Sequence, residues 1–182
     1  MSIQVLAIIG AGPAGRAFAL RCATSGLDVV LQDVMPSNLH RAQDEYAELT
    51  VPKDAGSLRF ASTIEDATRD ADIAIDFVPD ELESKLEMIS LLDRLAPPHT
   101  IFCTPCRALS ITELASCTHR AGLCVALRGS DPNVLESPLE VVRSKFSDPA
   151  ALFAVSVFLM RIGIAFSVAD DLEPMLVTNL AR

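Results

Sequence analysis

The sequence predicts an α/β fold with a doubly wound, mostly parallel sheet and helices on both faces. Three observations support this prediction. Apolar runs of strand length alternate along the chain with segments of helical pattern. The first run, Ile3–Ile9, is continuously apolar, as a strand between two helical layers should be. A glycine-rich turn then joins this run directly to a helix.

Length and composition limit both the fold and the partners. The chain has 182 residues, enough for one sizeable core, so we expect one domain over residues 1–182. Half of the residues are hydrophobic and the mean hydropathy is +0.34, which is typical of a globular protein. The net charge of −9 would repel phosphate backbones, so nucleic acid is not an expected partner.

In the first half of the chain, N-cap residues, glycines and prolines mark where the predicted helices begin and end. Gly26 ends the first helix, and Ser37 is the expected N-cap of the second. Asp80, with Glu83 three residues later, forms an expected capping box for the fourth helix, which two consecutive prolines end. Strands are expected at Ile3–Ile9, Asp28–Gln32, Leu58–Ala61 and Asp72–Val78, and helices at Pro13–Ser25, Ser37–Leu49, Ile64–Arg69 and from Asp80 onward.

The second half continues the alternation. Ser110 and Glu113 form another capping box, and the helix that they open is expected to end at Gly122. The apolar segment Ala150–Ala169 is long enough to span a membrane, but an arginine and a glycine interrupt its middle. We therefore expect a buried helix and a strand there, and no membrane partner. Strands are expected at Thr100–Cys103, Leu123–Leu127, Leu139–Val142 and Ile164–Val168, and a helix at Pro149–Arg161.

The segment VLAIIGAGPAGRAFAL contains Gly10, Gly12 and Gly15 in the spacing G-x-G-x-x-G. The first glycine permits a tight turn, the second lets the backbone approach a pyrophosphate, and the third lets helix and strand pack closely. Pro13 occupies a position that needs no N–H, and the helix N-terminus around Ala14 offers N–H groups and partial positive charge to phosphates. This context predicts a Rossmann-like turn that binds a dinucleotide.

Asp33 ends the second predicted strand and selects among dinucleotides. A carboxylate there binds both ribose hydroxyls of an adenosine and repels a 2′-phosphate, and no Arg or Lys follows before Arg41. We therefore expect NAD rather than NADP. A flavin is the alternative cofactor, because GAGPAG also resembles the opening of many FAD-binding oxidoreductases. Those proteins usually carry Glu in place of Asp33 and have longer chains.

Along nearly its whole length, the chain resembles the NAD-binding domain of the 3-hydroxyacyl-CoA dehydrogenases. The resemblance rests on the glycine segment and on AIDFVPDELESKLEMISLLDRL, HTIFCTPCRALSITELA, LRGSDP and PLEVV. It implies a Rossmann fold, NAD as cofactor, and oxidation of a 3-hydroxyacyl-CoA or a similar hydroxy acid. It also implies that Asp80 and Lys85 contact the nicotinamide half of NAD, with Val78 and Cys106 beside them.

The chain departs from the family pattern at the catalytic positions. Arg107 stands where the family has a substrate-orienting serine, and Arg128 where it has the histidine that acts as general base. Glu140 matches the glutamate that pairs with this histidine. Arginine does not deprotonate at working pH, so we expect Arg128 to form an ion pair with Glu140 or to bind a carboxylate or phosphate. The family's next asparagine falls at Thr178, beside Asn179, and we expect the protein to lack the helical C-terminal domain of the family.

Because of these replacements, we consider two functions. We expect NAD binding with a dehydrogenase activity that is weak, altered or absent. The alternative is a non-catalytic module that senses the redox state or assists assembly. The apolar segment Leu172–Leu180, within the C-terminal residues 172–182, and an exposed sheet edge also need covering, so we expect a homodimer.

The pair Cys103 and Cys106 raises the possibility of a metal or dithiol site. Zinc needs four ligands, but Cys117 and Cys124 are expected in a helix and a strand of the core. A redox pair usually opens a helix, whereas Cys106 lies in the loop before the Ser110 cap. We therefore expect no metal, with Cys103 in the core and Cys106 at the rim of the cofactor site. Unpaired cysteines without a secretory leader predict a cytoplasmic protein.

Overall fold

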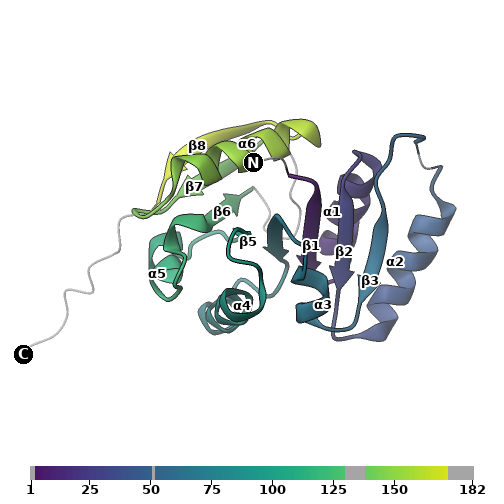
Figure 1. Cartoon of the computed structure of the whole chain (residues 1–182), viewed down its shortest axis with the longest axis horizontal. Coiled ribbons are helices and arrows are strands. Elements are labelled where there is room, and N and C mark those ends of the chain that lie inside the picture. Colours follow the sequence, from purple (N-terminus) through teal and green to yellow (C-terminus); the bar gives the residue numbers. More distant parts are fainter. Residues whose placement is uncertain (1–2, 51, 130–137, 172–182) are drawn as a thin grey trace, which may run out of the picture.

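The structure is a computed structural model that describes residues 3–50, 52–129 and 138–171. The strands in these ranges are β1 (Val5–Ile9), β2 (Asp28–Gln32), β3 (Leu58–Ala61), β4 (Ile73–Asp76), β5 (Ile101–Pro105), β6 (Cys124–Arg128), β7 (Leu139–Arg143) and β8 (Phe166–Asp170). They form one sheet in the order β3-β2-β1-β4-β5-β6-β7-β8 (Figure 1). Strands β1 to β6 pair in parallel, while β7 is antiparallel to β6 and parallel to β8.

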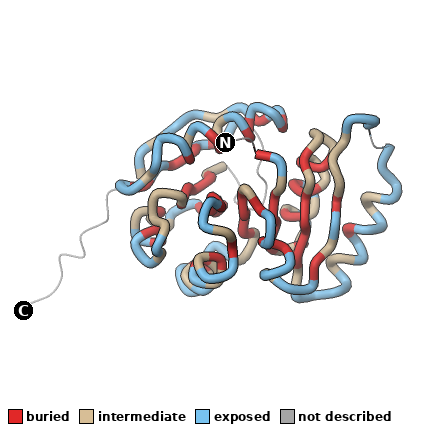
Figure 2. The backbone as a smooth tube through the Cα atoms, viewed as in Figure 1, coloured by how far each residue is buried: buried red, intermediate tan, exposed pale blue. Residues whose placement is uncertain are grey.

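Helices cover both faces of this sheet, which confirms the doubly wound fold. They are α1 (Pro13–Thr24), α2 (Pro36–Glu48), α3 (Ile64–Thr68), α4 (Leu82–Leu95), α5 (Ile111–Ser116) and α6 (Pro149–Arg161), with a short 3₁₀ turn at Ala121–Leu123. Side chains of α1, α2 and α6 pack on one face, and side chains of α3, α4 and α5 pack on the other. Figure 2 shows the buried residues concentrated along the strands and on the inner sides of the helices.

The strand order places a topological switch point between β1 and β4. From β1 the chain winds outward to β2 and β3, then crosses back to β4 on the other side of β1. The carboxyl ends of β1 and β4 therefore lie side by side at the point where the winding reverses. Ligands of doubly wound proteins bind at this switch point. The glycine turn, which follows β1, lies at this end of the sheet.

Glycines end helices α1 and α6, as the sequence predicts. Gly26 and Gly163 both adopt positive φ angles, of 84° and 70°. After α1, the N–H of Leu27 donates back to the carbonyl of Cys22 at 3.2 Å, and the corresponding bond follows α6. This is the bonding pattern with which a left-handed residue closes a helix.

Arg161, which interrupts the long apolar segment, joins two elements. Its guanidinium donates to the carbonyl of Ile3 at 3.0 Å and to that of Gly26 at 2.5 Å. It therefore fixes the end of α6 to the start of β1 and to the turn before β2. The segment forms α6 and β8, and none of the helices in the described ranges is long and apolar enough to cross a bilayer.

Two of the predicted N-caps are wrong. Helix α2 begins at Pro36 with Met35 as its N-cap, so Ser37 lies inside the helix. Helix α4 begins at Leu82 with Glu81 as its N-cap, and neither N-cap side chain bonds the helix. In α2, proline at the first helical position fixes the backbone angle that a helix needs, which favours this start.

The helix that Ser110 caps is shorter than predicted. Its hydroxyl accepts a hydrogen bond from the N–H of Glu113 at 3.2 Å, as expected, but α5 ends at Ser116 and not at Gly122. Asp93 of α4 accepts hydrogen bonds from the N–H of His119 and from Nε of Arg120, both at 3.0 Å. These tertiary bonds hold the chain in a non-helical path after α5.

Some predictions lie outside the described residues. They concern the C-terminal segment 172–182, including Thr178 and Asn179, and the part of the LRGSDP block that follows Gly129.

Candidate dinucleotide-binding site

The glycine turn is compressed between β1, β4 and α1. Gly10 has a φ of 103°, and a Cβ added there would lie 3.0 Å from the carbonyl oxygen of Phe77, which follows β4. A Cβ on Gly15 would lie 1.9 Å from the carbonyl oxygen of Gly10. Both positions therefore require glycine, one for its backbone angle and one for the close approach of helix and turn.

Gly12 is different, because it faces open space. It is the N-cap of α1 and has a φ of −61°, and a Cβ added to it would meet nothing within 4 Å. The first turn of α1 contains no acidic residue and starts with Pro13. N–H groups in the first turn of a helix have no partner within it, so Ala14 and Gly15 present donors at the positive end of the helix dipole. This region fits the diphosphate of a dinucleotide.

Asp33 lies directly after β2 and beside this turn. Its Oδ2 accepts hydrogen bonds from the N–H of Ala11 at 2.6 Å and from Nδ2 of Asn38 at 3.1 Å. Its Oδ1 accepts from the N–H of Met35 at 2.7 Å. The carboxylate thus links the glycine turn to the start of α2, at the position from which the fold reads an adenosine ribose.

Arg16, which the sequence reasoning missed, holds the same turn from the other side. Its Nη1 donates to the carbonyl of Ala11 at 3.1 Å, and its Nε donates to the carboxylate of Glu45 in α2 at 3.1 Å. The peptide groups on both sides of Ala11 are therefore fixed, one through Asp33 and the other through Arg16. No local pattern in the sequence indicates this role, because it depends on the packing of α1 against α2.

The side chain of Lys85 is buried and bonds a second charged residue, while its expected contact with nicotinamide stays a prediction. Its ammonium group bonds the carboxylate of Asp76, at the end of β4, and both side chains are almost fully buried. Burial raises the pKa of Asp76, and the positive charge of Lys85 partly offsets this effect. The pair is a buried ion pair beneath the carboxyl ends of β4 and β5.

Asp80 also differs from its expected helix-capping role. Its Oδ2 accepts a hydrogen bond from the N–H of Arg107 at 2.9 Å, which connects the loop after β4 to the loop after β5. Val78 is half-buried in the same β4–α4 loop. Val78 and Asp80 thus lie in a loop at the carboxyl end of β4, and their contact with nicotinamide stays a prediction.

Cys106 is part of the core and not of the rim. It is fully buried, its thiol donates to the carbonyl of Leu109 at 3.7 Å, and burial raises its pKa to about 11. Cys103 and Cys124 are buried as predicted, but Cys117 is exposed at the end of α5. All five cysteines are free, and the described residues contain no cluster that could hold a metal ion.

Arg128 and Glu140 lie opposite each other on β6 and β7, but they do not form the expected ion pair. Nη2 of Arg128 instead donates to Oδ1 of Asp171 at 3.1 Å and to the carbonyl of Leu109 at 3.0 Å. Glu140 is exposed, and within the described ranges no ion pair joins it to Arg128. Asp171, at the end of β8, was not identified from the sequence.

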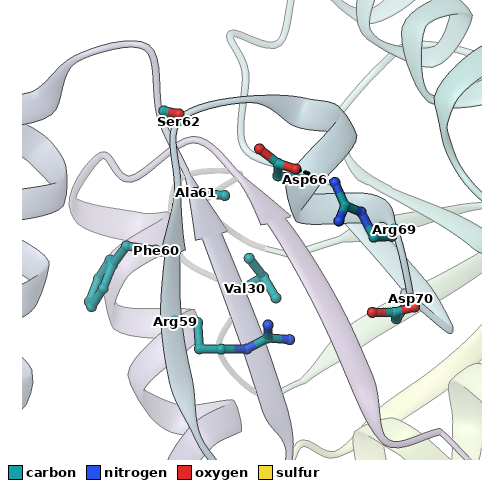
Figure 3. Close-up of a pocket in the computed structure, with 8 residues that line it drawn as sticks. All are labelled: Val30, Arg59, Phe60, Ala61, Ser62, Asp66, Arg69 and Asp70. Atoms are coloured by element: carbon teal, nitrogen blue, oxygen red, sulfur yellow. Dashed lines mark hydrogen bonds and ion pairs between the residues drawn. The ribbon is translucent and has the colours of Figure 1, made fainter.

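A separate pocket of about 370 Å³ lies between β3, β2 and α3 (Figure 3). Its charged lining consists of Arg59, Arg69, Asp66 and Asp70, and Arg69 pairs with Asp66 at 2.5 Å. Two acidic and two basic side chains balance each other, so the lining does not favour an anion. Neither the glycine turn nor Asp33 contributes to this pocket.

Comparison with known proteins decides the family. The family model for the NAD-binding domain of 3-hydroxyacyl-CoA dehydrogenase matches residues 5–168. The chain belongs to this family. This 3-hydroxyacyl-CoA dehydrogenase NAD-binding domain has the fold and the nicotinamide-cofactor class that the sequence predicted.

Two curated relatives show how far the similarity extends. The chain is 28% identical to a probable 3-hydroxybutyryl-CoA dehydrogenase of Bacillus subtilis, over 98% of this chain and 66% of the relative. It is also 28% identical to a 5-formyl-3-hydroxy-2-methylpyridine 4-carboxylate 5-dehydrogenase of Mesorhizobium japonicum, over 97% of this chain and 60% of the relative. The chain therefore spans less than two thirds of the length of these relatives.

A solved structure agrees with this family assignment. The NAD⁺-dependent 5-formyl-3-hydroxy-2-methylpyridine 4-carboxylic acid 5-dehydrogenase superimposes with a TM-score of 0.81 at 27% identity. The match covers 96% of this chain and 60% of that one.

Proposed function

We propose that this domain binds NAD across the switch point between β1 and β4. The observation that supports this proposal best is the open space at Gly12, at the N-terminus of α1, with Asp33 beside it. In the proposed complex, the amides of Ala14 and Gly15 bind the diphosphate and Asp33 binds the adenosine ribose. The negative charge of Asp33 disfavours the 2′-phosphate of NADP. The family match also supports a nicotinamide cofactor over a flavin.

Titration of NADH by its fluorescence tests this proposal. We expect saturable binding with a dissociation constant on the order of micromolar, and much weaker binding of NADPH. A signal that does not saturate up to millimolar NADH would contradict the proposal. A yellow protein on purification would indicate the flavin instead.

We further propose that the domain serves NAD-dependent oxidation of a 3-hydroxyacyl-CoA or a similar hydroxy acid. NAD supplies the hydride acceptor for such a reaction. The reaction also needs a base, and Arg128, with its permanent charge and its bond to Asp171, cannot accept a proton. Glu140, exposed opposite it on β7, is the proton acceptor that remains of the expected pair. The names of the two curated relatives, a 3-hydroxybutyryl-CoA dehydrogenase and a pyridine carboxylate dehydrogenase, support acyl-CoA or hydroxy-acid chemistry for those proteins.

An absorbance assay at the NADH band separates this activity from the non-catalytic alternative. With 3-hydroxybutyryl-CoA and NAD, we expect a slow rise in absorbance that Glu140→Gln abolishes while NADH affinity is unchanged. If NADH binds but no hydroxyacyl substrate is turned over, the domain is a redox sensor or assembly module.

We also propose a cytoplasmic homodimer. The free cysteines support a reducing compartment. Support for a dimer comes from the exposed apolar side chains of Phe153, Val157 and Met160 on α6, and from β8 at the edge of the sheet. Light scattering should give twice the mass of the chain, and a stable monomer would contradict the dimer.

A further inference from the structure

The carboxylate of Asp33 has fewer free positions than a bidentate ribose contact needs. An ionised carboxylate offers about four acceptor positions, two on each oxygen. Oδ2 already accepts hydrogen bonds from Ala11 and Asn38, and Oδ1 accepts one from Met35. One position therefore remains, on Oδ1, whereas an adenosine ribose presents two hydroxyls.

The hydrogen bond from the N–H of Ala11 to Oδ2 of Asp33 is held in place by the surrounding fold. Ala11 is fully buried, so its N–H has no water to replace Asp33. The carbonyl of Ala11 is held by Arg16, which Glu45 holds in turn. The N–H of Gly10 donates to the carbonyl of Gln32 at 2.8 Å. The peptide group that contacts Asp33 is thus constrained through both of its neighbours, and the Asp33–Ala11 bond is expected to persist when a ligand binds.

The amide of Asn38 offers what Asp33 lacks. An ionised carboxylate is only an acceptor, so the amide must turn its NH₂ group toward Asp33, and the 3.1 Å bond has this orientation. The carbonyl oxygen of the amide therefore points away from Asp33 with both of its acceptor positions available. Asn38 is half-exposed at the start of α2, so its amide is accessible beside the carboxylate that is proposed to bind the ribose.

We propose that Asn38 is a ribose-binding residue, with one adenosine hydroxyl on Oδ1 of Asp33 and the other on the amide oxygen of Asn38. This inference rests on the proposed binding of NAD. The sequence assigned both ribose hydroxyls to Asp33 alone, whereas here each hydroxyl binds a different side chain. Both hydroxyls then act as donors, and a 2′-phosphate, which has no proton to donate at neutral pH, has no acceptable position at either side chain.

Calorimetric titration of NAD, 2′-deoxy-NAD and 3′-deoxy-NAD into the full chain tests the proposal. Asn38→Ala should weaken NAD binding about three- to tenfold, the effect of one hydrogen bond. It should not change the affinity for the one deoxy analogue that lacks the hydroxyl bound by Asn38. Ser37→Ala, at the neighbouring exposed position of α2, is the matched control and should bind all three ligands like the wild type.

Each other outcome overturns the proposal. If Asn38→Ala weakens all three ligands equally, Asn38 only orients Asp33 and does not contact the ribose. If the variant binds NAD like the wild type, the inference fails while the proposed function stands. If the wild type binds no NAD at all, the proposed function fails, and the inference fails with it.

Discussion

At the scale of single residues, substitutions at two glycines of the turn should affect different properties: Gly12 matters for ligand binding and Gly15 for stability. Gly12 has a backbone conformation open to any residue, and an added Cβ meets no protein atom. Gly12→Ala should therefore change the free energy of unfolding by less than about 0.5 kcal/mol. The same methyl group would occupy the space proposed for the diphosphate, so NADH affinity should fall by about tenfold or more. Urea unfolding and NADH fluorescence measure the two effects.

Gly15→Ala is the matched contrast. Its Cβ would overlap the carbonyl oxygen of Gly10 at 1.9 Å, and this atom belongs to the rigid backbone. We expect a loss of about 1–3 kcal/mol in the free energy of unfolding, the usual cost of overpacking. If Gly15→Ala were as stable as the wild type, or if Gly12→Ala bound NADH normally, the described geometry of the turn would be wrong.

The buried pair of Lys85 and Asp76 makes a second prediction at this scale. Lys85→Met would leave the carboxylate of Asp76 buried without its partner, at a cost of about 3–5 kcal/mol in unfolding free energy. The double variant Asp76→Leu/Lys85→Met removes both charges and should recover most of this loss. Lys145→Met, on the exposed surface, is the control. Equal stability of the two lysine variants in urea would contradict the burial of Lys85.

At the scale of elements, Asp171 joins three parts of the fold. Its carboxylate accepts hydrogen bonds from the hydroxyl of Ser110 at 2.6 Å, from the N–H of Thr112 at 2.8 Å, and from Arg128 at 3.1 Å. It thus ties the end of β8 to the start of α5 and to the end of β6. Asp171→Asn should lower the unfolding free energy by about 2–3 kcal/mol, because Arg128 would lose its counter-charge.

The adjacent Asp170→Asn is the control for this prediction. Asp170 pairs with Arg143 across β7 and β8, but both side chains are exposed to solvent, which screens the pair, so the change should cost much less stability than Asp171→Asn. Chemical denaturation of the two variants gives the comparison. A larger loss for Asp170→Asn than for Asp171→Asn would contradict the role of Asp171.

The elements show what local sequence could predict. Apolar runs and glycine stops placed the strands and most of the helices, because those signals act over a few residues. Capping boxes were less reliable: Ser110 caps its helix, but Asp80 contacts Arg107 on the next loop instead. Helix α5 ended early because Asp93 binds the chain that follows it. Partners distant in sequence decided these cases, and no local pattern reports them.

In the candidate site too, local sequence predicted some contacts, and tertiary packing determined the others. The glycine positions and Asp33 follow from the geometry of a single βα unit, and the structure brings them together. The bond of Lys85 with Asp76 depends on how α4 packs on the sheet, and the bond of Arg128 with Asp171 depends on the order in which β6, β7 and β8 pair. The contacts of Arg16 with Glu45 and of Asn38 with Asp33 depend on how α2, which lies outside the motif, packs beside α1 and the glycine turn, so they appeared only in the structure.

At the scale of the whole molecule, several carboxylates make stability depend on pH. A hydrogen bond from Ser57 lowers the pKa of Asp28. Burial alone would raise the pKa of Asp93 and Asp171, but hydrogen bonds from His119 and Ser110 and their neighbours outweigh it and lower both pKa values. Asp76, with its raised pKa, acts in the opposite direction.

The sign of the pH effect follows from these directions. A carboxylate with a lowered pKa in the folded state stabilises the fold above its unfolded pKa of about 3.9, and loses this contribution as the pH falls through the folded value. The pKa of the exposed Asp170 is also lowered, by its bond with Arg143. With four lowered carboxylates against one raised, the protein should be less stable at pH 3 than at pH 5. Urea unfolding at pH 7, 5 and 3 checks this, and constant stability between pH 5 and pH 3 would contradict it.

The central claim is that NAD binds at the turn between β1 and α1. Amide hydrogen exchange with and without saturating NADH tests it most directly, because it reports the binding position as well as binding. We predict slower exchange over Gly10–Arg16 and at Met35 beside Asp33, with little change in β8. Unchanged exchange over the glycine turn at saturating NADH would contradict the account.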